Sequence, residues 1–165
     1  MIVNERSNDF SRCRTDWHGD HTPHGVWKKI VIGDKNIENA KAIEKTLTDA
    51  GFDVSIMEMD ISSRASIKNM IAGAQKYGKI AMLVNAAGVS PSQAPVEAIL
   101  NVDLYGTAVL LEEVGEVIKG GGVGVTISSQ SGHRMPALTP EEDEQLATTP
   151  IEELLGLSIL QPENI

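Results

Sequence analysis

The chain has 165 residues, the length of a single domain with a sizeable core. Its formal net charge of −9 argues against nucleic acid and anionic membrane surfaces as partners. The single cysteine, Cys13, excludes an internal disulfide and fits the reducing cytoplasm. No apolar run approaches the roughly 20 residues of a membrane span, and the amino terminus lacks the apolar core of a signal peptide. We therefore expect a cytoplasmic protein that binds neither nucleic acid nor membrane.

Residues 1–27 have neither helical nor strand periodicity and are rich in Arg, Asp, Ser and His, which predicts a poorly ordered tail. The tail contains His18, His21 and His24 at three-residue intervals, with Cys13, Asp16 and Asp20 nearby. They could form a metal site, or the histidines could be solvated. A three-residue histidine spacing with one cysteine fits no standard structural zinc pattern, so we expect no metal.

Residues 28–60 predict a strand, a helix and a second strand. The first strand covers 28–34 and ends in Gly33-Asp34. Asn36 is placed to cap a helix whose apolar residues recur every three or four positions until Ala50-Gly51. Alternating apolar and polar residues over 53–60 predict the next strand.

A second helix is predicted over 64–77, started by Asp60 or a following serine and stopped by Gly78. The apolar run Ile80–Asn85 then predicts a buried parallel strand, which ends in Ala-Ala-Gly. These small residues allow a flat ligand to lie against the backbone, and Asn85 can hold the turn by bonding to backbone groups.

Beyond residue 88 the sequence predicts a loop, a long helix over 96–119, and a glycine turn into a buried strand that ends at Ser129. Thr139-Pro140-Glu-Glu is a strong helix start, and Thr149-Pro150 repeats it. We expect 136–165 to form a helical, lid-like segment whose apolar stretch 154–160 contacts substrate or a partner chain.

Three motifs in this order resemble the short-chain dehydrogenase/reductase family. They are Asn85-Ala-Ala-Gly88, Asn101 thirteen residues later in Asn-Val-Asp-Leu-Tyr-Gly-Thr, and Ile127-Ser-Ser129. The similarity runs from about residue 30 to 132. It implies an α/β fold with a Rossmann-like, doubly wound parallel sheet and helices on both faces, here over 28–135. It also implies NAD(P)-dependent hydride transfer to or from a small carbonyl or alcohol substrate.

The resemblance implies cofactor-binding residues at three strand ends: Asp34, Asp60, Ile61, Asn85, Ala86, Ala87 and Gly88. At the family's positions, Asp34 would accept the adenosine ribose hydroxyls and favour NAD over NADP. Asp60 would accept a hydrogen bond from the adenine amino group. From the residues alone, Asp34 could instead be a surface acid that helps to start a helix, and Asp60 a helix cap.

The resemblance also implies two catalytic residues. Ser129 would orient the substrate carbonyl, with Ser128 or Ser131 as possible substitutes. Asn101 would lie at a local break in its helix and hold a water linked to the catalytic lysine. Alternatively, Ser129 only satisfies backbone groups at a strand end, and Asn101 is a surface or capping residue.

Two defining motifs of the family are missing. No Gly-x-x-x-Gly-x-Gly turn precedes residue 34, and neither Tyr77 nor Tyr105 is followed by lysine at the fourth position. We therefore expect a truncated domain with an incomplete sheet, weak NAD (or NADP) binding and no turnover by this chain alone. The alternative is a non-catalytic interaction or oligomerisation domain on a Rossmann-like core. In either case exposed strand edges lead us to expect a homo-oligomer.

Loss of the family's first strand would leave the position between the second and fourth strands empty. Three outcomes are open: a gap about 5 Å wide per missing strand, direct pairing of the strands at 30 and 82, or filling of the position by part of the tail.

Overall fold

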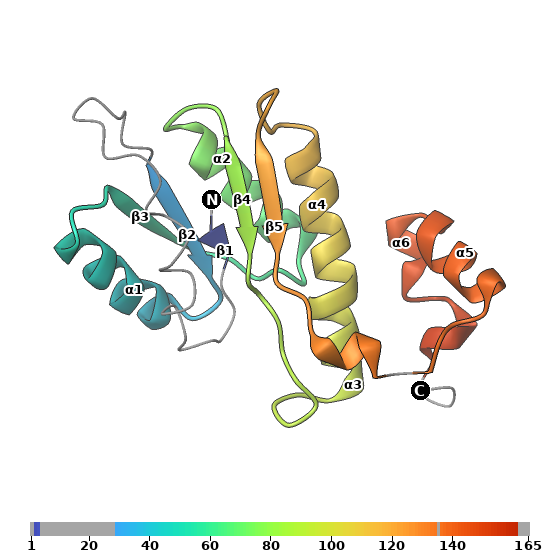
Figure 1. The fold of residues 1–165 in the computed structure, drawn as a ribbon. Helices are drawn as coiled ribbons and strands as arrows, with labels where there is room; N and C mark the ends of the chain where they lie inside the picture. The colour runs from blue at the N-terminus through green and yellow to red at the C-terminus, as the bar shows by residue number, and fades with distance from the viewer. Residues whose placement is uncertain (1, 4–28, 135, 162–165) are drawn as a thin grey trace.

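The computed structural model describes residues 2–3, 29–134 and 136–161. Its centre is a sheet of five parallel strands in the order β3-β2-β1-β4-β5 (Figure 1). The strands are β1 (Ile2–Val3), β2 (Ile30–Asp34), β3 (Val54–Glu58), β4 (Met82–Asn85) and β5 (Val123–Thr126). The fold class expected from the sequence, a Rossmann-like α/β sheet with parallel strands, is confirmed.

The position of the missing first strand is filled by the chain's own amino terminus. Ile2 pairs with Ile32 on one side and with Val84 on the other, and Val3 pairs with Gly33 and Asn85. Of the three possible outcomes, the structure shows the filling of this position by part of the tail. The tail histidines and the other potential metal ligands near them lie outside the described residues.

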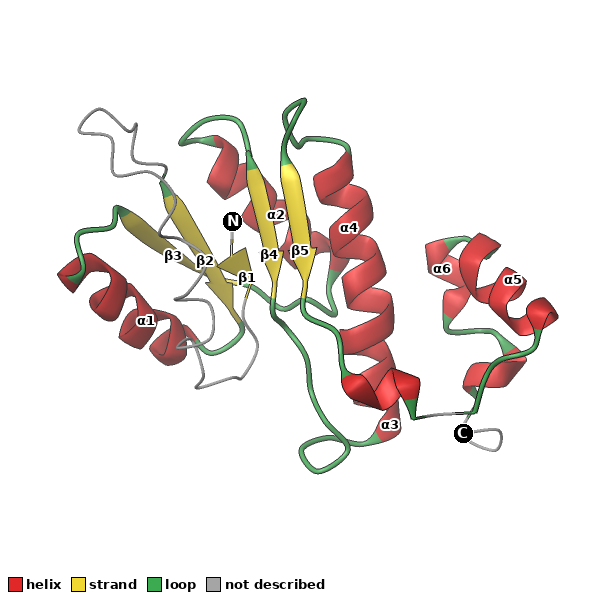
Figure 2. Ribbon diagram, viewed as in Figure 1, coloured by secondary structure: helices red, strands yellow, loops and turns green. Residues whose placement is uncertain are grey.

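The helices lie where the apolar periodicity predicts them (Figure 2). They are α1 (Ile37–Asp49), α2 (Arg64–Gln75), α3 (Val96–Ile99), a π-helix (Leu100–Gly106), α4 (Thr107–Gly115), α5 (Pro140–Thr148) and α6 (Ile151–Leu154), with 3₁₀ turns at Gln130–His133 and Ser158–Leu160. In the part of the chain that the structure describes, no helix is both long and apolar enough to cross a membrane.

Helix starts follow the sequence at most positions. The side chain of Asn36 accepts a hydrogen bond from the Glu38 amide, which caps α1. Ser63, rather than Asp60, caps α2. Thr139 forms a complete capping box at the start of α5. The second predicted cap is wrong, because α6 begins after Pro150 and has no side-chain cap.

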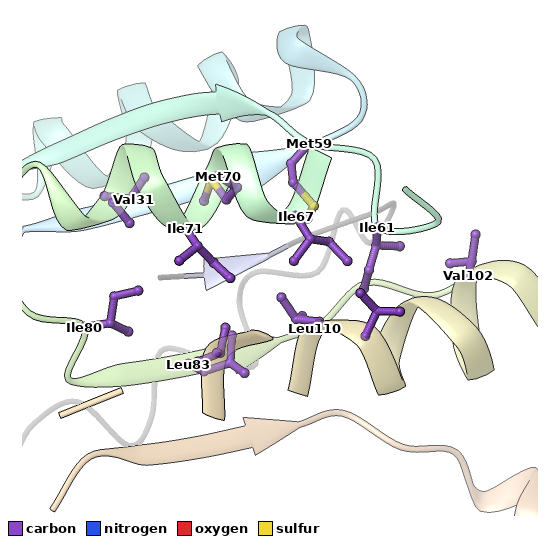
Figure 3. Close-up of a cluster of buried hydrophobic side chains, with 13 residues drawn as sticks. Val31, Met59, Ile61, Ile67, Met70, Ile71, Ile80, Leu83, Val102 and Leu110 are labelled. Atoms are coloured by element: carbon purple, nitrogen blue, oxygen red, sulfur yellow. The ribbon is translucent and has the colours of Figure 1, made fainter. Parts of the chain in front are cut away.

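The main hydrophobic cluster lies between the sheet and the pair α2 and α4 (Figure 3). Val31 of β2, Met70 of α2 and Leu110 of α4 belong to it. Ile32 is also fully buried but lies outside this cluster, as expected for a neighbour that points to the other face of a strand. Helix α1 contacts β2 and β3 and forms the second helical layer of the fold.

The predicted long helix is interrupted by the π-helix. Gly106, its last residue, lies against the loop that follows β3. A Cβ atom at this position would be 2.7 Å from the Ile61 carbonyl oxygen and 3.1 Å from that of Asn101. Glycine is therefore required here by the close approach of two backbone segments, and the local break implied for Asn101 is present.

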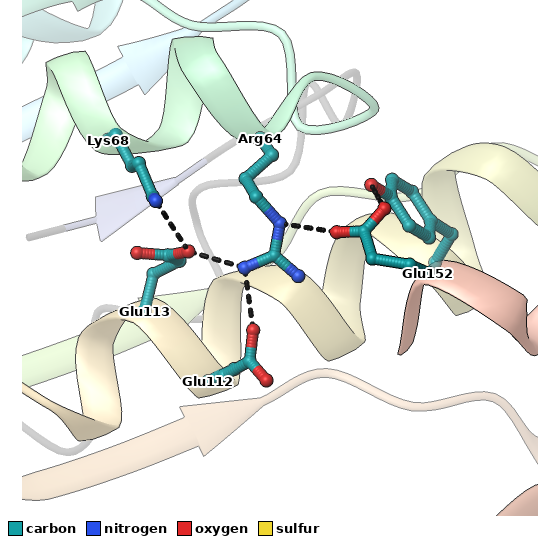
Figure 4. A network of polar contacts seen from close by, with 6 residues as sticks. Arg64, Lys68, Glu112, Glu113 and Glu152 are labelled. Atoms are coloured by element: carbon teal, nitrogen blue, oxygen red, sulfur yellow. Dashed lines mark hydrogen bonds and ion pairs between the residues drawn. The ribbon is translucent and has the colours of Figure 1, made fainter. Parts of the chain in front are cut away.

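The carboxyl-terminal helices contact the rest of the fold through Ile151, which packs against the hydrophobic cluster, and through an ionic cluster. Leu154 is only 4% exposed, so this part of the stretch predicted to contact substrate or a partner is buried within its own chain. Arg64 of α2 pairs with Glu113 and Glu112 of α4 and with Glu152 of α6, the last two at 2.6 Å and 2.7 Å (Figure 4).

The last strand departs from the sequence prediction. A buried strand was expected up to Ser129, but all four residues of β5 are exposed. Val123 and Val125 each keep 50% of their surface accessible, since β5 ends the sheet and the described residues do not cover its outer side.

Candidate functional site

All strands run in parallel, so their carboxyl ends meet at one edge of the sheet, the place where open α/β sheets bind ligands. A cavity of about 330 Å³ lies at this edge. It is lined by residues that follow β2 and β4 and by the start of the long helix: Asp34, Lys35, Asn36, Val89, Gln93, Ala94, Pro95, Ala98 and Val102.

Asp34 is the predicted site residue that lines this cavity. It is the last residue of β2 and is only 1% exposed. Its Oδ1 accepts a hydrogen bond from the Asn36 amide at 2.7 Å, which fixes the turn into α1. The two interpretations of this residue are thus compatible: the carboxylate helps to start the helix and also lies in the cavity wall.

Asp60 is held by its own loop at the end of β3. It accepts hydrogen bonds from the Ser62 amide and hydroxyl at 3.0 Å and 2.6 Å, and pairs with Lys35 at 2.9 Å. Desolvation raises the pKa of Asp60, but the bonds from Ser62 and Lys35 lower it by more, so that the net pKa lies below its usual 3.8. Lys35 lines the cavity, so its ion pair with Asp60 connects that carboxylate to the cavity wall.

The Asn85–Gly88 segment forms the expected turn. The buried Asn85 accepts a hydrogen bond from the Ala87 amide at 3.2 Å and donates one to the Thr107 hydroxyl at 3.2 Å. It therefore ties the end of β4 to the start of α4. Ala86, Ala87 and Gly88 are all partly exposed, and none of them carries a side chain that would block a ligand.

Asp103 stabilises the same loop and was missed by sequence reasoning. Its Oδ1 accepts a hydrogen bond from the Val89 amide at 2.9 Å. Desolvation raises the pKa of this carboxyl, and the bond from Val89 only partly opposes the effect. A Cβ atom on Gly88 would lie 3.4 Å from Asp103 Oδ1, so the loop passes close to the helix.

The two predicted catalytic residues do not line the cavity. The side-chain amide of Asn101 donates to the Glu97 carbonyl of its own helix at 2.8 Å. Ser129 caps the 3₁₀ turn Gln130–His133 by accepting from the Ser131 amide at 3.1 Å. Ile61 is fully buried in the core. Their family roles stay predictions.

Most of the cavity wall comes from residues that the motifs did not indicate. Gln93 closes the loop after β4 by accepting from the Ser90 amide at 3.0 Å. Ala94, Pro95, Ala98 and Val102 supply an apolar wall. Only their position in the sequence could have indicated these residues, because a Pro- and Ser-rich loop that follows a central parallel strand lies next to the edge of the sheet where ligands bind. In the described residues no cluster of His, Cys, Asp and Glu could hold a metal ion.

Comparisons with known proteins agree with this geometry. Residues 27–140 match the family of short chain dehydrogenases. A short-chain dehydrogenase/reductase of Alternaria brassicicola is 33% identical over 138 residues, which are 83% of this chain and 50% of that protein. An uncharacterized oxidoreductase of Thermotoga maritima is 31% identical over 61% of this chain and 43% of its own. The chain thus spans half or less of these relatives.

Solved structures give the same result for the fold. A short-chain dehydrogenase/reductase from Serratia marcescens superposes with a TM-score of 0.58 at 22% identity, covering 66% of this chain and 48% of its own. A citronellol catabolism dehydrogenase of Pseudomonas aeruginosa gives a TM-score of 0.58 at 28% identity with the same coverage. The motifs, the strand order and these matches lead to one conclusion: the chain belongs to the short-chain dehydrogenase/reductase family of oxidoreductases.

Proposed function

We propose that this chain holds the adenosine part of a nicotinamide dinucleotide in the cavity at the carboxyl ends of β2 and β4. The observation that carries the proposal is the nearly fully buried Asp34 carboxylate in the wall of a 330 Å³ cavity. A carboxylate there can accept hydrogen bonds from two vicinal ribose hydroxyls. It would repel a 2′-phosphate, so we propose NAD as the preferred cofactor.

The remaining cavity residues fit the same group. The apolar wall of Ala94, Pro95, Ala98 and Val102 offers a surface on which a flat base can pack. Lys35, which also lines the cavity, pairs with Asp60 at 2.9 Å and would hold that carboxylate close to the bound base. The small residues after Asn85 leave room for the cofactor to continue across the strand ends.

The chemistry of the family is hydride transfer between the nicotinamide of such a cofactor and a carbonyl or alcohol. This chain would contribute orientation: Ser129, the proposed hydrogen-bond donor to a substrate oxygen, follows β5 at the same sheet edge. Neither described tyrosine has a lysine four residues later to lower its pKa, so the proton transfer has no assigned group here. We therefore propose weak cofactor binding, without turnover by this chain alone.

Thermal melting with and without NADH tests the proposal. A ligand at about 100 times its Kd stabilises the folded state by about 2.7 kcal/mol. For a chain of this length, that corresponds to an upward shift in Tm of about 5–11 °C. Asp34→Asn should weaken NADH binding roughly tenfold to hundredfold, because a charge-assisted hydrogen bond contributes about 1.5–3 kcal/mol.

The matched control is Asp53→Asn, because Asp53 is exposed, pairs with Lys29 and lies outside the cavity lining. It should bind NADH like the wild type. Equal shifts for the wild type and for Asp34→Asn would contradict the proposed role of Asp34. An NADH-dependent rate with a carbonyl substrate would contradict the proposed inactivity while supporting the site.

A further inference from the structure

The loop after β4, residues 86–95, forms much of the cavity wall. Four of the nine residues that line the cavity in the described structure belong to it: Val89, Gln93, Ala94 and Pro95. The shape of the cavity therefore depends on where this loop lies. A loop without helix or strand loses conformational freedom when it is held in one position, so a specific contact is needed to hold it there.

The hydrogen bonds inside the loop shape its tip but do not attach it to the rest of the fold. Gln93 Oε1 accepts from the Ser90 amide and from the Ser90 hydroxyl, both at 3.0 Å. The Gln93 amide donates back to the Ser90 carbonyl at 2.8 Å. These bonds join two residues of one turn, and by themselves they leave that turn free to move as a unit relative to the sheet.

Asp103 supplies a contact from outside the loop. Its Oδ1 accepts a hydrogen bond from the Val89 amide at 2.9 Å, although the two residues are 14 positions apart in the chain. A carboxylate that accepts from a backbone amide forms a charge-assisted bond, which is stronger than a neutral one. The bond holds the loop at Val89, one of the residues that line the cavity.

The π-helix that carries Asp103 is itself firmly held. Gly106, its last residue, packs against the backbone of the loop after β3. Thr107, the next residue, accepts a hydrogen bond from the side chain of Asn85 at 3.2 Å. Val102, the neighbour of Asp103, is 7% exposed and lines the cavity. Asp103 therefore connects the loop to a fixed part of the cavity wall, and π-turns inside helices are frequent at functional sites.

We propose that Asp103 is a positioning residue for cofactor binding, which holds the loop after β4 where it forms the wall of the dinucleotide cavity. The inference rests on the proposed function, because it concerns the affinity of that same cavity for NADH. Asp103 is not one of the lining residues, so it acts through Val89 rather than by touching the cofactor. A loop that is already in place lowers the ordering cost of binding.

Asp103→Ala removes the acceptor of the Val89 amide. The loop should then form the cavity wall for only part of the time, and the Kd for NADH should rise roughly three- to tenfold. Asp103→Asn keeps a carbonyl oxygen that can accept the same bond, so its Kd should stay within about twofold of the wild type. The lost negative charge does not explain a weaker affinity, since NADH is an anion and removal of a carboxylate favours its binding.

Glu97→Ala is the matched control. Glu97 is an exposed acid on α3, in the same continuous helical stretch, and it is not one of the residues that line the cavity. This variant should bind NADH like the wild type. Fluorescence titration of the full chain with NADH measures each Kd. A purely structural role of Asp103 would lower stability without changing the Kd of the folded protein.

Hydrogen exchange without NADH measures the position of the loop directly. In Asp103→Ala the amides of residues 86–95 should exchange faster than in the wild type, while those of α2 keep their rates. Circular dichroism checks that each variant is folded. Asp103 is exposed, so alanine should leave the core intact. If Asp103→Ala does not fold, Asp103→Leu, which also lacks an acceptor, takes its place in both measurements.

Weaker NADH binding and faster loop exchange in Asp103→Ala, with both restored in Asp103→Asn, support the proposal. Equal Kd values for the wild type and Asp103→Ala overturn it and leave the proposed function standing. Equally weak binding by Asp103→Asn or by Glu97→Ala also overturns it, since the effect would not come from the acceptor at Asp103. A wild type that does not bind NADH refutes the proposed function, and the role of Asp103 in cofactor binding is refuted with it.

Discussion

Replacing Gly106 with alanine tests the packing of the interrupted helix against the loop after β3. The added Cβ would lie 2.7 Å from the Ile61 carbonyl oxygen, where ordinary contact begins near 3.4 Å. The atoms that this Cβ would meet, the carbonyl oxygens of Ile61 and Asn101, belong to the backbone, so no side chain can rotate away to make room. The helix and the loop must therefore separate by about 0.5 Å or more.

Such a separation disturbs a fully packed region. Ile61, Val109 and Leu110 beside the contact are completely buried. Overpacking in a well-packed core costs about 1–3 kcal/mol, and the gain in helix propensity from glycine to alanine offsets at most about 1 kcal/mol. We expect Gly106→Ala to lower the free energy of unfolding by about 1–2 kcal/mol, and Tm by about 2–8 °C.

Gly115→Ala is the control, in α4, which directly follows the π-helix. A Cβ atom at Gly115 meets nothing within 4 Å, so alanine should stabilise the protein by up to about 1 kcal/mol through helix propensity alone. Urea unfolding with fluorescence or circular dichroism measures both variants. The midpoints should move in opposite directions while the slope m stays the same. If Gly106→Ala is as stable as the wild type, the close approach of the two backbones is refuted.

Two further predictions concern the ionic cluster around Arg64 and the stability of the fold at low pH. Glu152→Gln should lower the free energy of unfolding by less than about 1 kcal/mol, because the Glu152 side chain of the pair with Arg64 is 65% exposed. Leu154→Ala should lower it by about 2–5 kcal/mol, because Leu154 is buried. Urea midpoints give the ranking, and the reverse order would be inconsistent with a segment held by burial. The lowered pKa of Asp60 means that its bond to Ser62 stabilises the fold above pH 3.8 and that this contribution is lost as the pH falls further. Asp60→Asn should therefore be less stable than the wild type at pH 7, and the difference should shrink below about pH 4; a constant difference would argue against the assignment.

The fold was predictable because its local signals agree with its tertiary contacts. Apolar periodicity located α1, α2 and α4, and the caps at Asn36 and Thr139 act as their residue types predict. The second cap failed because Pro150, not Thr149, is the residue at the helix boundary. The burial of β5 failed for a different reason. An apolar run specifies a strand, but burial depends on what covers it, and that is a property of other segments.

The candidate site was predictable in part. Asp34 could be placed because a parallel strand delivers its last residue to the ligand edge. Residues of the cavity wall such as Gln93, Ala98 and Val102 could not, since they have no distinctive chemistry and gather there only through the loop and helix geometry. Asp103 could not be predicted either. Its hydrogen bond to Val89 joins two segments, and neither segment's sequence indicates that the other lies nearby.

The central position of β1 has a consequence for folding kinetics. Ile2 is synthesised before Ile32 and Val84, yet its strand must insert between them. Every hydrogen bond that β1 makes to β4 closes a loop of almost half the chain, a non-local contact of the kind that slows folding. We expect β2, β3 and α1 to associate early. Joining them to the half built from β4 and β5 would then be the late step of refolding.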